Sequence, residues 1–237
     1  MIATSEIRRS DRQLYLFNKL VDCVVALLQA KGKMNPFDKY RVVDFFQRIE
    51  FQRRGSPHAH ILLWFDCDNR EPVSEPNTIQ LVTDLCAVSR DDLPGDQYNN
   101  QIHRHTFTCT KRGETCRFNI PYWPISETCV LLPMSKDDIR RSGFHLMAAN
   151  LCEIIEEKHY DTLNEFYIDN GLTETKYLDK IRSTLRWPAL MFKRDFTEIY
   201  TNTSNRWIGQ TLGSNTDLQF ILGEYSCAAY VVEYVNK

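Results

Sequence analysis

The sequence predicts an α+β fold arranged around an antiparallel central sheet with flanking helices. Two patterns support this prediction: several stretches carry apolar residues at helical spacing, and two strand-like segments near a histidine pair are separated by a turn, as in a hairpin. The 237-residue chain is 43% hydrophobic and 25% charged, which is ordinary for a soluble globular protein.

The chain begins with a predicted helix followed by a predicted hairpin. Residues 11–30 place apolar side chains at helical spacing, with Ser10 as a plausible N-cap and Gly32 as a plausible stop. Residues 41–52 and 58–65 are expected to be strands, because the residues that join them include a Gly-Ser-Pro turn sequence.

Further along the chain, helices and short strands are separated by irregular segments. Residues 101–129 are rich in histidine, cysteine, aromatic residues and proline, and we expect them to be irregular with short strands. Ser135 and Asp138 form a capping box that predicts a helix reaching about residue 158. The other predicted elements are a short helix at 78–86 within a polar loop at 67–100, a helix at 161–185 broken near Gly171, short strands at 190–192 and 218–222, and a helix at 226–235.

Composition excludes several classes of protein. No apolar run approaches the ~20 residues that span a bilayer, and the N-terminus lacks the order of a signal peptide. We therefore expect an intracellular protein that makes no membrane contact and whose eight cysteines are buried apolar residues or metal ligands. The net charge of −2 counts against a non-specific DNA binder, and the absence of a GxxxxGK[ST] motif excludes a P-loop NTPase.

His58 and His60 form the first candidate site. Alternate residues of a strand share one face, so the two imidazoles are expected to point the same way. If the turn folds the preceding strand back beside them, Glu50 or Gln52 can complete a three-ligand site that suits Mg²⁺, Mn²⁺ or Zn²⁺. The structural alternative is a pair of partly buried histidines at the end of an edge strand.

Two tyrosines near the C-terminus form the second candidate site. Tyr230 and Tyr234 stand four residues apart, so on a helix their side chains lie one above the other, and Lys237 can lie close to Tyr234. A tyrosine can attack a phosphodiester as a nucleophile, and a nearby ammonium group favours its phenolate. The alternative is that both tyrosines belong to an apolar helix stripe that packs in the core.

A third group combines two histidines and two cysteines within fourteen residues. His103, His105, Cys109 and Cys116 can hold a tetrahedral structural Zn²⁺, with Cys129 as a substitute ligand. Their spacing matches no common zinc-finger pattern, and the alternative is a buried irregular segment with reduced cysteines.

Taken together, these segments resemble three blocks of one protein family. Residues 50–64, EFQRRGSPHAHILLW, closely resemble the block that marks the Rep-type region of Helitron transposases. Residues 103–111, HRHTFTCTK, followed by CRFNIP at 116–121, are similar to the next block of animal Helitrons. Residues 215–222, NTDLQFIL, running into YSCAAY at 225–230, are similar to the third. The blocks occur in the family's order.

The resemblance implies an HUH endonuclease core, in which the histidine motif lies on a central strand of an antiparallel sheet and the tyrosine helix packs nearby. It implies that residues 41–237 form this Rep-like nuclease domain, with a possible zinc-binding insertion at 101–129, and that residues 1–40 end the family's N-terminal region. His58 and His60 match the paired metal ligands, with Glu50 as the better third ligand and Gln52 as the alternative.

The implied activity is metal-dependent nicking and strand transfer on single-stranded DNA, as in rolling-circle transposition. Mg²⁺ or Mn²⁺ would polarise the scissile phosphate while one of the two tyrosines attacks it, giving a 5′-phosphotyrosine and a free 3′-hydroxyl. In this reading Tyr230, Tyr234 and Lys237 match the family's catalytic residues. Candidate phosphate contacts are Arg53, Arg54 and Lys193. A nuclear location follows from this activity.

The resemblance also leaves open an alternative to an active nuclease. Full-length relatives continue into a helicase that is absent from this sequence, so we expect a truncated piece or degenerate copy of a transposon gene. Such a piece can be a catalytically inactive remnant that binds single-stranded DNA or is only structural. A zinc-stabilised interaction module without any DNA function is the third hypothesis.

Overall fold

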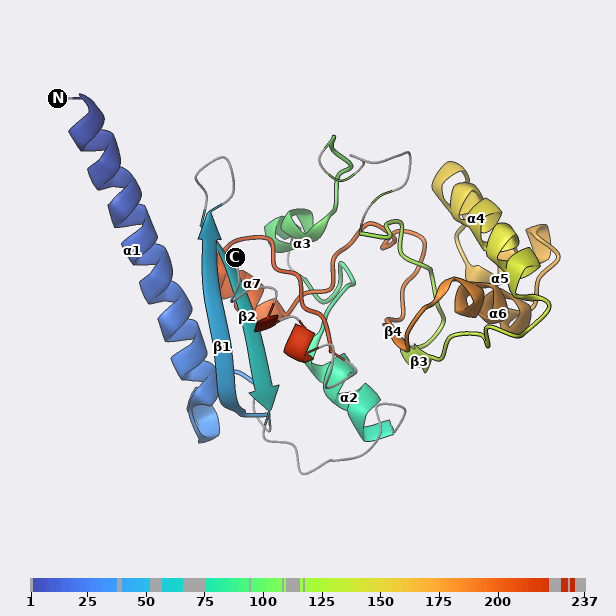
Figure 1. The fold of residues 1–237 in the computed structure, drawn as a ribbon, viewed down its shortest axis with the longest axis horizontal. Helices are drawn as coiled ribbons and strands as arrows, with labels where there is room; N and C mark the ends of the chain where they lie inside the picture. Colours follow the sequence, from blue (N-terminus) through green and yellow to red (C-terminus); the bar gives the residue numbers. More distant parts are fainter. Residues whose placement is uncertain are drawn as a thin grey trace. The chain divides into compact units, whose positions relative to one another are not determined.

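The computed structural model describes residues 2–37, 40–51, 57–65, 76–93, 95–107, 109, 116, 118–221, 227–229 and 231–232, with side chains from residue 14 onward except at residues 51, 77 and 78. Helices and strands are mixed along the chain (Figure 1), which confirms the α+β class. The strands described form two separate two-stranded antiparallel sheets, β1–β2 and β3–β4.

The chain divides into two compact units. We call them the hairpin unit (residues 1–70, 210–212 and 223–237) and the helical unit (residues 71–209 and 213–222). The hairpin unit contains α1 (Ile2–Gln29), the short 3₁₀ helix η1 (Gly32–Met34), β1 (Val42–Phe51) and β2 (Pro57–Phe65). The helical unit contains α2 (Pro76–Leu85), α3 (Gly95–Gln101), β3 (Cys129–Leu131), α4 (Arg141–Glu157), α5 (Leu163–Asp169), α6 (Glu174–Thr184), β4 (Ala189–Met191) and most of α7 (Arg206–Leu212).

The predicted N-terminal helix is confirmed by α1, which begins nine residues earlier than the apolar pattern suggested. Its last two turns bury Val21, Val24, Val25 and Leu28 at the spacing of a single helix face. Gly32 follows with a φ of +65°, a left-handed conformation that glycine adopts without steric cost. This turn lets the chain leave the helix and enter the hairpin.

The predicted hairpin is confirmed by β1 and β2, which pair antiparallel along almost their full length. A register shift between Val42 and Asp44 bends the start of β1. The Gln47 side chain donates to Asp22 of α1 at 3.2 Å, so α1 covers the face of the hairpin to which Gln47 belongs. Because side chains alternate along a strand, the even-numbered residues of β2, and those of β1 from Asp44 onward, lie on the opposite face.

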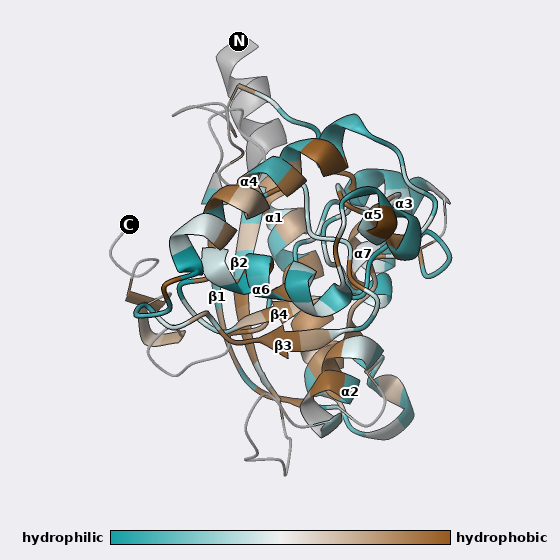
Figure 2. Ribbon diagram, turned by 90° about the vertical axis from the view of Figure 1, so that its right-hand side faces the viewer, coloured by the Kyte–Doolittle hydropathy of each residue, from teal (hydrophilic) through white to brown (hydrophobic). Residues whose placement is uncertain are grey.

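The helical unit has its core where α4, α5 and α6 meet β3 and β4. Fully buried Phe166, Tyr177 and Ile181 form its centre, and their rings and side chains pack against Leu151 of α4 and Phe196 beyond β4. Along α4, hydrophobic stretches alternate with hydrophilic ones, as expected of a helix with one buried face (Figure 2).

Local signals explain most helix ends in this unit. The hydroxyls of Thr162 and Thr173 accept hydrogen bonds from backbone N–H groups three residues later and cap α5 and α6. Gly171, with a φ of +61°, separates these two helices, as the sequence predicted. The expected capping box is wrong, because α4 begins at Arg141 and Ser135 lies in the turn before it.

Three further sequence predictions concern short elements. The helix expected at 78–86 is α2, and the strand expected at 190–192 is β4. Residues 218–221 are not a strand. Residues 227–229 and 231–232 are helical, in line with the helix expected at 226–235. Within the described part of the chain, no helix is both long and apolar enough to cross a membrane.

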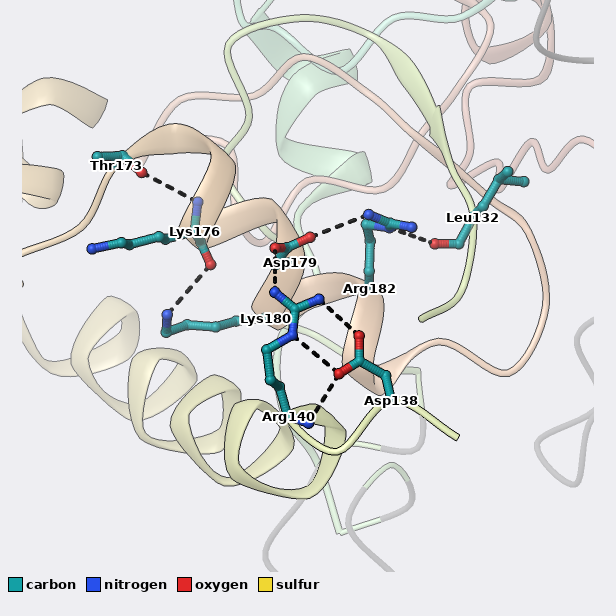
Figure 3. A network of polar contacts seen from close by, with 8 residues as sticks. All are labelled: Leu132, Asp138, Arg140, Thr173, Lys176, Asp179, Lys180 and Arg182. Atoms are coloured by element: carbon teal, nitrogen blue, oxygen red, sulfur yellow. Dashed lines mark hydrogen bonds and ion pairs between the residues drawn. The ribbon is translucent and has the colours of Figure 1, made fainter. Parts of the chain in front are cut away.

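An ion-pair network joins the turn before α4 to α6 (Figure 3). The Arg140 guanidinium donates two hydrogen bonds, of 3.0 and 2.7 Å, to the Asp138 carboxylate and lies 3.9 Å from the Asp179 carboxylate. Asp179 pairs with Arg182 at 3.1 Å, and Arg182 donates to the Leu132 carbonyl at 2.9 Å. The Arg140 hydrogen bonds lower the pKa of Asp138 to about 2.

A buried arginine organises the segment after β4. Arg194 donates to the Glu198 and Thr201 carbonyls and to the Thr203 hydroxyl, and its guanidinium lies 4.2 Å from the centre of the Tyr122 ring. Only 4% of this residue is exposed. A guanidinium has five donors in a fixed fork, so one side chain satisfies several buried acceptors of an irregular loop.

Candidate functional site

The histidine pair lies on the face of the hairpin that α1 does not cover. Glu50 stands directly opposite His58 in the β1–β2 register, and Arg48 stands opposite His60. Directly paired residues of antiparallel strands project to the same side. The turn therefore folds β1 back beside the histidines, as the sequence argument required, and Glu50 is the carboxylate that it brings there.

Side-chain distances confirm this grouping. The His58 and His60 rings pack edge to face with 4.7 Å between their centres. The Glu50 Oε2 atom lies 3.5 Å from the His60 Nε2 atom, and its Oε1 atom lies 3.9 Å from the Arg48 Nε atom. We call Arg48, Glu50, His58 and His60 the histidine face.

The histidine face is open to solvent at His58 and partly buried elsewhere, since Leu62 on the same side of β2 is only 9% exposed. His58 is exposed, and the side chains of His60 and Glu50 are 18% and 31% exposed. Two imidazole nitrogens and a carboxylate are donors that suit Mn²⁺, Zn²⁺ or Mg²⁺, and an open face leaves positions for water and phosphate oxygens. Without a metal, the same side chains make a cross-strand ion pair, which is the structural alternative.

Several predicted site residues lie outside the described residues. These are Gln52, Arg53, Arg54, Tyr230, Tyr234 and Lys237. Lys193 is described and belongs to the helical unit, where its side chain is exposed and its backbone N–H donates to the Thr128 hydroxyl. Its role as a phosphate contact therefore stays a prediction.

The two histidines and two cysteines of residues 103–116 do come together. One nitrogen or sulfur atom from each of His103, His105, Cys109 and Cys116 lies within 4.8 Å of the other three. We call these four residues the His/Cys cluster. In the part of the chain that the structure describes, it is the one group of three or more His, Cys, Asp or Glu side chains whose ligand atoms converge enough to hold a metal ion.

The distances in the His/Cys cluster match a tetrahedral zinc site. The Cys109 Sγ atom lies 3.6 Å from His105 Nδ1, and the Cys116 Sγ atom lies 3.6 Å from His103 Nε2. With Zn–S of about 2.3 Å and Zn–N of about 2.1 Å, a tetrahedral angle separates sulfur from nitrogen by about 3.6 Å. Two of the four S–N edges of such a site therefore already have the required length.

Backbone turns place these ligands. The His103 N–H donates to the Tyr200 carbonyl at 2.7 Å and fixes the first ligand against the segment after β4. The Cys109 N–H closes a turn on Thr106, and the Asn119 N–H closes another on Cys116. Each cysteine thus sits at a tight turn, although the cluster contains no regular helix or strand.

Local electrostatics favours the ligand forms of these side chains. The Thr106 N–H donates to the Cys109 sulfur at 3.2 Å, and this bond is the main cause of a lowered pKa of the Cys109 thiol, with His105 and Cys116 adding to it. Burial, followed by the charge of His105, lowers the pKa of His103. A metal binds thiolates and neutral imidazoles, so both shifts favour binding.

Two neighbours of these sites were not among the predicted site residues. Arg48 stands two residues before Glu50, and strand parity alone could have placed it on the histidine face. Glu156 of α4 approaches the His105 Nε2 atom at 4.0 Å, on the ring nitrogen that does not face Cys109. A metal-binding histidine commonly pairs the ring nitrogen that does not bind the metal with a carboxylate. No sequence pattern could link His105 to Glu156, because the two residues are 51 positions apart.

Cys129, the substitute zinc ligand considered from the sequence, lies elsewhere. It pairs with Met191 at the start of β3 and packs against the core of the helical unit. Burial and the charges of Glu127 and Glu174 raise the pKa of its thiol.

Comparison with protein-family models, with curated proteins and with solved structures finds no match for this chain. The functional argument therefore depends on the geometry of the two candidate sites.

Proposed function

We propose that this chain is a Helitron-like HUH endonuclease module that nicks single-stranded DNA and transfers the strand. One observation carries the proposal: the β1–β2 register sets Glu50 opposite His58 and brings its carboxylate within 3.5 Å of His60. An HxH pair alone is common, but the pair beside a carboxylate on an open strand face is the arrangement that the Helitron resemblance requires. The same proposal includes two further expectations from the resemblance, a central antiparallel sheet and a nuclear location.

The donors of the histidine face are of the chemical types that bind a catalytic cation, although their ligand atoms do not converge on one point in this structure as those of the His/Cys cluster do. His58, His60 and Glu50 would hold it, and their exposure leaves room for a phosphate oxygen. Mg²⁺ or Mn²⁺ bound there supplies Lewis-acid polarisation of the phosphate. Arg48, 3.9 Å from Glu50, adds positive charge that attracts the DNA backbone.

The tyrosines would supply the nucleophile. The hydroxyl oxygen of Tyr230 or Tyr234 attacks the phosphorus, a new O–P bond forms, and the bond from phosphorus to the 3′ oxygen breaks. The tyrosine proton is lost to solvent, and the departing 3′ oxygen gains one. The second tyrosine can cut another strand, and attack by the free 3′-hydroxyl reverses the step and joins strands.

Cleavage of a labelled single-stranded oligonucleotide in the presence of Mn²⁺ tests the proposal. The wild-type chain should cleave, and Glu50→Gln or His60→Ala should lower the rate by about 100-fold, as expected for loss of a group that positions charge at the phosphate. Val43→Ala is a matched control, because Val43 is exposed at the bulge of the same strand, outside the histidine face. Equal rates in Glu50→Gln and wild type would contradict the proposal.

A second function is favoured by a different observation. We propose that the His/Cys cluster holds one structural Zn²⁺, because its four ligand atoms lie within 4.8 Å of one another and two of its four S–N distances already match a tetrahedral site. If the histidine face makes only an ion pair, the chain is a zinc-stabilised binding module without nuclease activity. That module would retain DNA or a protein partner, cleave nothing, and become less stable when zinc is removed.

A further inference from the structure

Two phenylalanines next to the His/Cys cluster are exposed to solvent. Phe107 is 80% exposed and Phe118 is 48% exposed. Single exposed apolar side chains are ordinary, but these two belong to the same short segment and both stand within two residues of a proposed zinc ligand. Neither ring belongs to the small buried group that contains the two cysteine ligands and Ile120.

The cluster holds the Phe118 ring and the backbone at Phe107 in place. The Phe118 ring packs edge to face against the His103 imidazole with 5.7 Å between the ring centres. Phe107 lies inside the tight turn that Thr106 and Cys109 close through their backbone. A ring that is already immobilised loses little conformational entropy when a ligand stacks on it.

Residues 103–118 are net basic, whereas the whole chain is slightly acidic. Residues 103–118 contain four basic residues and one acidic residue, whereas the whole chain has a net charge of −2. Arg104 lies between the two histidines and is exposed.

We propose that Phe107, Phe118 and Arg104 form a binding surface for single-stranded DNA. Unpaired bases stack on the two rings, and the guanidinium of Arg104 contacts the phosphate backbone. Exposed aromatic rings beside basic residues are the usual way in which proteins bind single strands without sequence preference. The choice of DNA as the ligand rests on the proposed function.

Fluorescence anisotropy with a labelled oligothymidine of about 16 nucleotides tests this surface in the zinc-loaded full chain, with Mg²⁺ and Mn²⁺ omitted so that nothing is cleaved. Phe107→Leu and Phe118→Leu should each weaken binding by about 5- to 150-fold, because leucine keeps the apolar bulk but cannot stack. Phe107→Tyr should keep the wild-type affinity. Arg104→Gln should reduce the slope of log affinity against log salt by about 0.7.

Trp187→Leu is the matched control, because Trp187 is 79% exposed in the same unit but lies just before β4. The affinity of Trp187→Leu for the oligothymidine should equal that of the wild type. All variants should retain one zinc per chain. Unchanged binding in both leucine variants, or an equal loss in Trp187→Leu, would overturn the proposal. Cleavage is measured separately: a chain that cleaves normally with both phenylalanines replaced refutes the surface alone, and one that binds through them without cleaving refutes the nuclease alone.

Discussion

Replacing Cys109 by serine should release one zinc ion and destabilise the helical unit. Cys109 is only 2% exposed, and its sulfur lies 3.6 Å from the His105 nitrogen with which it would share the metal. Serine keeps the size of the side chain but removes the thiolate that binds zinc strongly. The fold around the cluster has little else to support it, because two of its three buried residues, Cys109 and Cys116, are themselves ligands.

The size of the effect follows from linkage between binding and folding. Zinc present at 100 times its dissociation constant stabilises the folded state by about 2.7 kcal/mol. In a chain of this length each kcal/mol shifts the melting temperature by about 2–4 °C, so the expected loss is about 5–11 °C. A chelator should lower the melting temperature of the wild type by the same amount and should leave the melting temperature of Cys109→Ser unchanged.

Metal analysis of the purified chain and calorimetric melting are the assays. Cys129→Ser is the control, because Cys129 is half-buried in β3 away from the cluster. It should retain one zinc per chain and its chelator response. A wild-type chain without zinc, or a Cys109→Ser chain that binds a full equivalent, would refute the reasoning.

Three further predictions concern the rest of the helical unit. Arg194→Lys should lower the free energy of unfolding by about 1–3 kcal/mol in urea titrations, because an ammonium group cannot reach all three acceptors of the fork, whereas Arg186→Lys at an exposed site should change nothing. The hydrogen bonds from Arg140 lower the pKa of Asp138 from 3.8 to about 2, so its stabilising effect is present above pH ~4 and is lost as the pH falls toward 2; melting curves of Asp138→Asn and wild type should therefore differ at neutral pH and converge near pH 2. Gly213 ends α7 with a φ of +58°, and Gly213→Ala should cost about 1–2 kcal/mol by thermal melting, an expectation that an unchanged melting temperature would contradict.

Periodicity predicted the elements that depend on local sequence. The helix at the N-terminus, the two long strands and the break at Gly171 follow from apolar spacing and from a residue that adopts a positive φ. The predicted start of α4 was wrong because Ser135 and Asp138 satisfy a local motif, while in the structure Asp138 binds Arg140, which also approaches Asp179 of α6. Competition between local and tertiary hydrogen bonds is invisible in a single sequence.

The candidate sites were predictable to different degrees. Strand parity and one turn sufficed to place Glu50 beside the histidines. The His/Cys cluster could be proposed from residue types, but its convergence depends on contacts with distant residues such as Tyr200, which pairs with His103 through the backbone. No sequence pattern predicted that Phe107 is exposed, because a phenylalanine in an irregular segment can equally well be buried.

The covalent intermediate tests the nuclease proposal most directly. The wild-type chain is incubated with single-stranded DNA and Mn²⁺, and its peptides are analysed by mass spectrometry for a nucleotide attached to tyrosine. We expect a 5′-phosphotyrosine on Tyr230 or Tyr234 that depends on the metal, weakens in Glu50→Gln and disappears when both tyrosines are replaced by phenylalanine. Absence of the adduct in the wild type, or an equal amount in the double phenylalanine variant, would contradict a tyrosine-based nuclease.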